Sequence, residues 1–281
     1  MTEQAFTVLG ANGFVGGAMA RFLKARGFVC HTPEKGDESI FKFPLGHVIY
    51  AVGLTADFRT RPFDTVEAHV CLLRRLLQEG TFSSLVYLSS TRVYAASART
   101  DESAPTLVDV NVPDFLYNIS KLMGESLSLH CGRAGVRVAR LSNVVGLRFD
   151  TDTFIDQILA EGFSCGAVHL RTSLTSCKDY IHIDDVVTLL AGIAMHGRHG
   201  LYNVASGIGV SNQHIAALLA EYTGISASVA EDAATWEFSP INTDRITSEF
   251  GFTPRAFDKY FLDHIQQFKQ QLSNRGKHDL S

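Results

Sequence analysis

A chain of 281 residues, of which 46% are hydrophobic, can bury a large core in one domain with a small additional lobe. The formal net charge of −4 argues against nucleic-acid binding, which usually needs a basic surface. No stretch approaches the ~18 apolar residues of a membrane-spanning helix, and the N-terminus lacks the pattern of a signal peptide. We therefore expect a cytoplasmic protein without membrane or nucleic-acid partners.

The sequence carries no metal-binding signature. Its cysteines are scattered and form no C-x-x-C pair, which indicates reduced thiols, as in a cytoplasmic protein. The one tight group of potential metal ligands is His182 with Asp184 and Asp185. We expect these three side chains to pin a loop and cap the following helix, and no metal site is predicted.

The N-terminal stretch predicts a nucleotide-binding turn between a strand and a helix. An apolar run from Phe6 to Leu9 enters the sequence G-A-N-G-F-V-G, and a helical pattern of apolar residues follows it. Glycine there lets the main chain turn tightly and approach a pyrophosphate, which the helix N-terminus also favours. The alternative is a glycine turn that holds no nucleotide. The cofactor-binding residues predicted in this turn are Gly10, Asn12, Gly13, Phe14, Val15 and Gly16.

A second strand is predicted at 28–32, and Glu34 follows it about 20 residues after the glycine turn. An acidic side chain at this place commonly binds the adenosine ribose hydroxyls, and a solvated turn residue is the alternative interpretation. We therefore expect NAD as the cofactor. NADP is the alternative, because Lys35 would suit a 2′-phosphate. The interval from Glu34 to His47 is too short for another helix and strand.

Strands and helices alternate through the first half of the chain, which predicts an α/β fold with a Rossmann-type doubly wound parallel sheet. Apolar, β-rich runs predict strands at 47–53, 84–90 and 136–141. Apolar side chains at three- and four-residue spacing predict helices at 63–79 and 114–131.

The pattern becomes less regular after about residue 150. We assign residues 1–150, with a returning segment at about 180–205, to the NAD(P)-binding Rossmann domain. Residues 151–272 mostly form a small C-terminal α/β substrate-binding lobe, and 273–281 a disordered tail. The elements predicted in this half are strands at 168–170 and 201–204 and helices at 154–159, 183–195, 212–222 and 257–272.

Tyr117 and Lys121 lie four residues apart on the predicted helix 114–131, so they share one face of it. An ammonium group beside a phenol stabilises the phenolate and lowers its pKa from ~10 towards neutrality, which suits acid–base catalysis. A hydroxyl group from a strand end could hold the substrate oxygen opposite the tyrosine. The alternative is an amphipathic helix with a half-buried tyrosine and a solvated lysine.

Further motifs follow in a fixed order: G-A-N-G-F-V-G from Gly10, L-S-S-T-R-V-Y from Leu88, Tyr117-x-x-x-Lys121 with Gly124-Glu125, R-L-S-N-V-V-G from Arg140, K-D-Y-I-H-I-D-D from Lys178, and Tyr202-Asn203-Val204. In this order they resemble the extended short-chain dehydrogenases/reductases, also called NAD-dependent epimerases/dehydratases. The resemblance runs from Phe6 to about Pro254.

The resemblance implies a catalytic role for Ser90, Tyr117 and Lys121. Tyr117 is then the acid/base, Lys121 tunes it and binds the nicotinamide ribose, and Ser90 hydrogen-bonds the reacting sugar oxygen. The resemblance also implies cofactor contacts at Ala51, Val52 and Gly53, and contacts to a nucleotide-diphosphate sugar from Ser90, Thr91, Asn143, Arg148 and Lys178. The alternative to a substrate contact is a strand-end cap for Asn143 and a solvated charge for Lys178.

The chain departs from the family pattern in several places. Dehydratases and decarboxylases of the family carry an acidic residue within two positions of the catalytic Ser/Thr, but Thr91 and Arg92 stand there, which disfavours dehydration. Lys178 replaces the usual arginine and loses bidentate phosphate geometry. His69 stands where a helix asparagine is common, and the segment after Glu34, which normally helps to wall the adenine pocket, is much shorter than in typical epimerases.

These observations lead to one main hypothesis and two alternatives. The main hypothesis is an NAD(P)-dependent nucleotide-sugar epimerase that oxidises its substrate transiently. The alternatives are an NAD(P)H-dependent nucleotide-sugar ketoreductase, which would use the same residues, and a non-catalytic NAD(P)-binding regulator. By resemblance, helices 63–79 and 114–131 would pair in a homodimer. The sugar, the nucleotide base and the epimerised carbon stay open.

Overall fold

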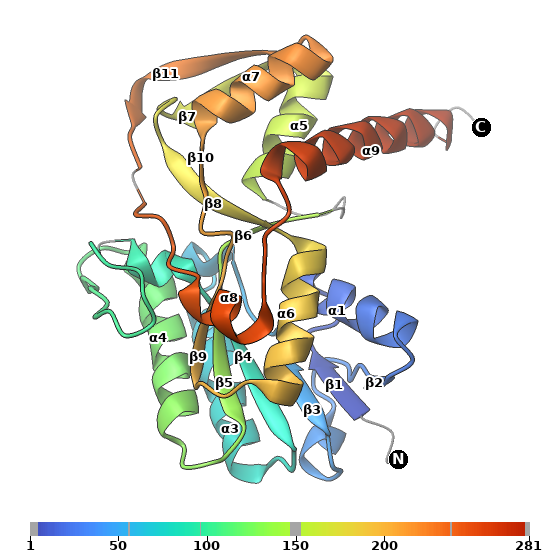
Figure 1. Ribbon diagram of the computed structural model, residues 1–281, viewed down its shortest axis with the longest axis vertical. Helices are drawn as coiled ribbons and strands as arrows, with labels where there is room; N and C mark the ends of the chain where they lie inside the picture. Colours follow the sequence, from blue (N-terminus) through green and yellow to red (C-terminus); the bar gives the residue numbers. More distant parts are fainter. Residues whose placement is uncertain (1–4, 56, 96, 147–152, 237, 279–281) are drawn as a thin grey trace.

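A six-stranded parallel sheet forms the centre of the larger body (Figure 1). The computed structural model describes residues 5–55, 57–95, 97–146, 153–236 and 238–278. The strand order is β2-β1-β3-β4-β5-β9, and each neighbouring pair is parallel, which confirms the predicted doubly wound sheet. Its strands are β1 (Ala5–Leu9), β2 (Val29–His31), β3 (His47–Tyr50), β4 (Ser84–Ser90), β5 (Val136–Leu141) and β9 (Leu201–Val204).

Helices cover both faces of this sheet, so its central strands are apolar on both sides, as expected for parallel strands. One face packs against α1 (Phe14–Ala25) and α6 (Ile183–His196) in a single apolar cluster. The other face packs against α3 (Leu72–Glu79) and α4 (Phe115–His130). Helix α6 and strand β9 return to the large sheet from the C-terminal half of the chain. The domain boundary predicted near residue 150 stays a prediction, because 147–152 lie outside the described residues.

The sheet ends at β2, on the side predicted to hold the adenosine. The usual doubly wound order places a further strand outside this position. Here the described segment 32–46 carries only the short 3₁₀ turn η1 (Glu38–Phe41) before the chain enters β3. The short interval after Glu34 therefore removes one edge strand, as its length predicts.

The predicted helix 63–79 contains a change of helical type. It consists of α2 (Pro62–Val66), a π-helical turn η3 (Glu67–Cys71), and α3. The apolar spacing along this segment fits an α-helix throughout, so no sequence pattern indicates the wider turn. Short π segments inside helices often lie at functional sites, and this one carries His69.

The smaller lobe has its own apolar core and two small sheets, β10-β8-β6 and β11-β7, above the large sheet in Figure 1. Strands β6, β8, β10 and β11 and helix α8 were not predicted, because they are short or, in β11, lack an apolar alternation. The elements are β6 (Asn143–Val145), α5 (Phe154–Cys165), β7 (Ala167–Thr172), β8 (Cys177–His182), β10 (Gly209–Ser211), α7 (Asn212–Thr223), β11 (Ser226–Ala234), α8 (Asp244–Phe250) and α9 (Phe257–His278).

Two boundaries in this lobe differ from the predictions. Helix α5 was predicted to end near Leu159 but extends to Cys165. It stops there because the next residue, Gly166, adopts a left-handed conformation. Helix α9 extends to His278, so 273–278 are helical rather than a disordered tail. Gly276 makes a helix unfavourable there by about 1 kcal/mol, but no proline interrupts this segment. Among the described residues, no helix has the length and apolar character needed to span a membrane.

Candidate active site

A cleft of about 1500 Å³ opens at the carboxyl ends of β1, β3, β4 and β5 and extends to the smaller lobe. The order of the strands reverses between β1 and β3, which is where doubly wound sheets bind their ligands. Pockets for one small ligand usually measure about 300–1,000 Å³. The cleft therefore has room for a dinucleotide and a second ligand.

The glycine turn has the geometry that a dinucleotide needs. Gly10 has φ of 84°, in the left-handed region that favours glycine. A Cβ atom at Gly16 would overlap the Gly10 carbonyl oxygen, so only glycine allows α1 to start this close to β1. Gly13, Phe14, Val15 and Gly16 line the cleft, where the unpaired N–H groups of the first helical turn would face a pyrophosphate. The turn thus fits the cofactor.

Other predicted cofactor residues lie in different positions. Ala51, Val52 and Gly53 follow β3 and line the cleft. Asn12 is exposed at the turn, and Glu34 is exposed and lies outside the cleft lining. Lys35 and Gly36 line the cleft instead, at the side where the sheet ends. The structure therefore does not bring Glu34 together with the glycine turn, and its ribose contact stays a prediction.

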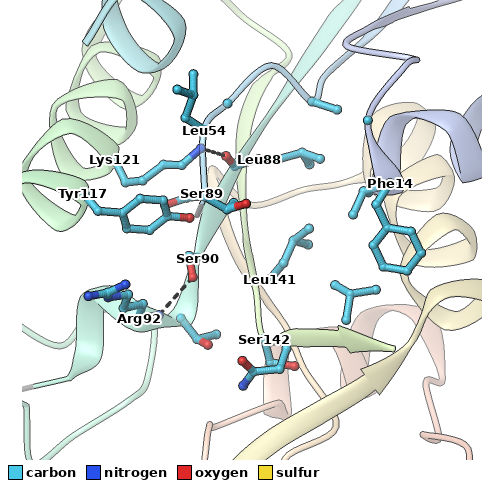
Figure 2. Close-up of a pocket in the computed structure, with 18 of the residues that line it drawn as sticks. Phe14, Leu54, Leu88, Ser89, Ser90, Arg92, Tyr117, Lys121, Leu141 and Ser142 are labelled. Carbon is cyan, nitrogen blue, oxygen red and sulfur yellow. Dashed lines mark hydrogen bonds between the residues drawn. The ribbon is translucent and has the colours of Figure 1, made fainter. Parts of the chain in front are cut away.

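Ser90, Tyr117 and Lys121 meet at one wall of the cleft (Figure 2). Ser90 ends β4, and its Oγ accepts a hydrogen bond from the Arg92 backbone N–H at 3.2 Å. The Ser90 side chain also hydrogen-bonds the Tyr117 phenol, so the two hydroxyl groups lie side by side. Tyr117 and Lys121 share one face of α4, and the Lys121 Nζ donates to the Leu88 carbonyl at 2.9 Å. The predicted set of three side chains is assembled beside the glycine turn.

Burial controls the ionisation of this set. Burial raises the pKa of Tyr117, while the Ser90 side chain and the Arg92 charge oppose the rise. Burial also lowers the pKa of Lys121 to about 7, against the attraction of Glu125. The sequence predicted a lowered pKa for Tyr117, and that expectation was wrong for the protein without ligands. The physical reason is that the desolvation of the phenol outweighs the nearby charges.

A buried ion pair joins helix α4, which carries Tyr117 and Lys121, to strand β5. The Arg140 guanidinium contacts the Glu125 carboxylate at 2.6 Å, and both side chains are buried. Glu125 also accepts a hydrogen bond from the Ser89 hydroxyl at 2.5 Å, next to Ser90 in β4. Arg140 donates to the Tyr94 hydroxyl at 2.6 Å. The network joins β4, β5 and α4, and so fixes Ser90 relative to Tyr117.

His69 is a site residue whose structural role the sequence did not reveal. Its side chain is 0% exposed and packs edge-on against the Tyr117 ring, with 5.5 Å between ring centroids. The His69 Nε2 accepts from the Leu54 backbone N–H at 3.3 Å, so Nδ1 carries the proton and donates to Ser120 Oγ at 2.8 Å. Ser120 in turn donates to the Tyr117 carbonyl. Its departure from the family asparagine was the only sequence signal.

The predicted substrate residues lie in two parts of the cleft, since Asn143 and Lys178 belong to β6 and β8 and Thr91 begins the turn after β4. The Asn143 side-chain amide donates to the Asp179 carbonyl at 2.8 Å, which joins β6 to β8 as a strand-end cap would. The Lys178 Nζ lies 4.5 Å from the Phe154 ring centroid. Thr91 lines the cleft and is buried, and Arg148 lies outside the described residues.

His182, Asp184 and Asp185 have the structural roles expected of them. The His182 side chain accepts from the Asp184 backbone N–H and caps α6. Asp184 and Asp185 both pair with Arg255, at 2.9 Å each, which holds the segment before α9 against the start of α6. Within the described part of the chain, no group of three or more His, Cys, Asp or Glu side chains could hold a metal ion.

Comparisons with known proteins agree with this arrangement. Residues 6–205 match the family described as the NAD-dependent epimerase/dehydratase family. A dTDP-glucose 4,6-dehydratase from Streptomyces griseus is 28% identical over 180 residues, which cover 61% of this chain and only 54% of the relative. The chain thus spans about half the length of that relative.

Two solved structures show the same fold. MoeE5 in complex with UDP-glucose and NAD superposes with a TM-score of 0.78 at 20% identity, over 95% of this chain and 99% of that one. A UDP-glucose 4-epimerase from Thermotoga maritima, in complex with UDP-glucose, gives a TM-score of 0.79 at 16% identity, with coverage of 95% and 99%.

Proposed function

Because the chain belongs to the NAD-dependent epimerase/dehydratase family, we propose that it is a nucleotide-sugar epimerase that oxidises and re-reduces one carbon of its sugar. The observation that carries the proposal is the convergence of Ser90, Tyr117 and Lys121 beside the glycine turn. A regulator that only senses NAD(P) would not need all three side chains. The neighbouring structures with UDP-glucose bound support a sugar nucleotide as substrate.

The chain's own residues provide the proton transfers. When bound, the nicotinamide supplies a reversible hydride acceptor for the sugar carbon. Tyr117, as phenolate, takes the proton of the sugar hydroxyl as that carbon becomes a ketone, and it returns the proton when the hydride comes back on the other face. Ser90, whose side chain hydrogen-bonds the Tyr117 phenol here, donates its hydroxyl hydrogen to the reacting oxygen once the sugar is bound. The Lys121 Nζ lies 5.9 Å from the Tyr117 ring centroid, and in its charged form it would act against the burial that favours the neutral phenol. Its pKa of about 7 lets it change protonation near neutral pH.

Dehydration is the activity that the site supports least, although one relative is a dTDP-glucose 4,6-dehydratase. Neither Thr91 nor Arg92 can act as the acid or base for loss of water. The cleft-lining carboxylate that accepts a hydrogen bond from Arg92 is Asp114. Arg59 also donates two hydrogen bonds to Asp114, at 2.6 and 2.5 Å. The bond to Arg59 lowers the pKa of Asp114, which makes it a poor proton donor at neutral pH.

The experiment uses the protein as purified, without added cofactor, and supplies UDP-, dTDP- and GDP-sugars in turn. We expect one pair of epimers to interconvert with no net change in the absorbance of reduced nicotinamide. The Tyr117→Phe variant should lose about 10²–10⁴-fold in rate. The exposed Tyr222, changed to Phe, is the matched control and should keep wild-type activity.

Each other outcome rejects the epimerase. Net consumption of NAD(P)H with a keto sugar would identify a ketoreductase, and release of water from the sugar would identify a dehydratase. If Tyr117→Phe turned over the active substrate at the wild-type rate, the assignment of the acid/base would be wrong.

A further inference from the structure

We propose that Arg92 binds a carboxylate on the sugar, so that the substrate is a nucleotide-linked sugar acid rather than a neutral sugar. The inference rests on the proposed nucleotide-sugar function and narrows its substrate class. Arg92 lines the cleft two residues after Ser90, in the short turn η4 (Thr91–Tyr94). It has no role in the proton transfers described above.

The backbone and side chain of Arg92 are both held beside the acid/base. Its N–H donates to Ser90 Oγ, and its carbonyl accepts from the Asn118 side chain at 3.2 Å. The guanidinium carbon lies 5.2 Å from the Phe58 ring centroid and 5.5 Å from the Tyr117 ring centroid. Two aromatic rings thus limit the positions of a cation next to the group that meets the reacting oxygen.

The guanidinium is short of hydrogen-bond partners. It has five N–H donors, yet within the described residues its side chain makes one hydrogen bond, to Asp114 at 3.4 Å. Asp114 already receives two shorter hydrogen bonds from Arg59, so its charge is largely neutralised there. The Arg92 side chain is 30% exposed and therefore only partly hydrated. A partly desolvated cation with free donors favours an anion from the ligand.

Arg92 and Lys178 line the same cleft, close enough for the Arg92 charge to help lower the pKa of Lys178, but they belong to different walls of it. Lys178, the cation predicted to contact the diphosphate, lies on β8 in the smaller lobe. Arg92 follows β4 in the large sheet, on the same wall as Tyr117 and Ser90, where the sugar ring must lie to react. The planar guanidinium fork matches a carboxylate with two parallel hydrogen bonds. The hydroxyl groups of a neutral sugar could accept single hydrogen bonds from this fork but carry no charge to pair with it.

The test is calorimetric titration of the as-purified protein in the Tyr117→Phe background, which blocks turnover. The probes are the nucleoside diphosphate, its glucose derivative and its glucuronate derivative, in the UDP and dTDP series. We expect the glucuronate derivative to bind at least about tenfold more tightly than the glucose derivative. Adding Arg92→Met should weaken the glucuronate derivative about 10- to 100-fold and leave the other two probes within about threefold.

Two further variants make the result specific. Arg92→Lys keeps the charge but loses the fork, so it should recover only part of the preference. Arg61→Met removes another cleft-lining arginine, one that pairs with Asp64, and should keep the whole preference. Thermal unfolding of each variant checks that it folds.

The outcomes separate this inference from the proposed function. Equal loss for all three probes on Arg92→Met would place Arg92 on the diphosphate and overturn the inference. Equal binding of the glucose and glucuronate derivatives by the unsubstituted arginine would overturn it as well, with the nucleotide-sugar function intact. If no probe of either series bound, and the corresponding GDP derivatives did not bind either, the proposed function itself would be contradicted.

Discussion

Replacing His69 by glutamine should remove a pH dependence of stability that comes from one buried ring. Burial, together with the nearby Lys121 charge, lowers the pKa of His69 to about 3. Protonation would place a second N–H at Nε2, which now accepts from the Leu54 backbone N–H. The charged ring would also lie beside Lys121, because both side chains contact the space above Gly53. The folded protein therefore strongly favours the neutral ring.

The magnitude follows from the difference between the folded and unfolded pKa values. The unfolded side chain has a pKa near 6.5, so between about pH 3 and pH 6.5 the unfolded state binds more protons than the folded state. The contribution of His69 is complete above pH 6.5 and is lost as the pH falls towards 3. Each pH unit in that window changes the free energy of unfolding by roughly 1.4 kcal/mol. The loss between about pH 6.5 and 4.5 is about 2 kcal/mol, because the unfolded side chain is only half protonated at pH 6.5.

Urea unfolding at a series of pH values measures this effect. Carboxylates also titrate in the window, so the informative quantity is the difference in unfolding free energy between wild type and His69→Gln. This difference should shift by about 2 kcal/mol in favour of the variant as the pH falls from about 6.5 to 4.5. The exposed His130, changed to Gln, is the control and should keep the wild-type dependence. A difference that stays constant across the window would refute the neutral, buried His69.

Two further predictions concern the glycine turn and the expected homodimer. Gly16→Ala places a Cβ against the Gly10 carbonyl, so it should cost about 1–3 kcal/mol in urea unfolding and weaken NAD binding by calorimetry. Gly192→Ala, whose Cβ makes ordinary contacts with Phe250, should do neither, and equal effects of the two variants would contradict the close approach. Phe63 is 88% exposed on α2, so Phe63→Asp should convert a dimer built on helices 63–79 and 114–131 to a monomer in sedimentation velocity. A wild-type monomer would contradict that pairing.

The large sheet could be predicted well because its strands are continuous apolar runs. Strands 84–90, 136–141 and 201–204 have the observed bounds, since turn residues flank each run. Most of the small strands of the other lobe could not be found in this way, although the strand predicted at 168–170 corresponds to β7 (Ala167–Thr172). They are three to nine residues long, and β11 (Ser226–Ala234) has no buried side chain to mark one face. Its pairing with β7 depends on tertiary contacts that no local pattern records.

The positions of the glycines in the site could be predicted, because only glycine fits their backbone geometry. The ionisation of its side chains could not, because it depends on burial and on neighbouring groups. Gly10 and Gly16 could be interpreted from backbone geometry alone, and the structure places both as that interpretation requires. The direction of the Tyr117 pKa shift could not be predicted from its spacing to Lys121, because that spacing does not show how deeply the phenol is buried. Glu34 fits the spacing for a ribose contact but lies on an exposed turn, since the chain lacks the outer edge strand that usually follows.

The π-helical turn η3 links the least predictable part of the fold to the chemistry. A pattern of apolar residues reports which face of a helix is buried, but an inserted residue changes that face only locally, so the pattern on either side stays helical. In η3 the inserted turn carries His69 into the space between Ser120 and Leu54, with its ring against Tyr117. An asparagine there would be too short to span both partners. The π turn therefore places the histidine where it joins Ser120 to the Leu54 backbone, which lines the cleft.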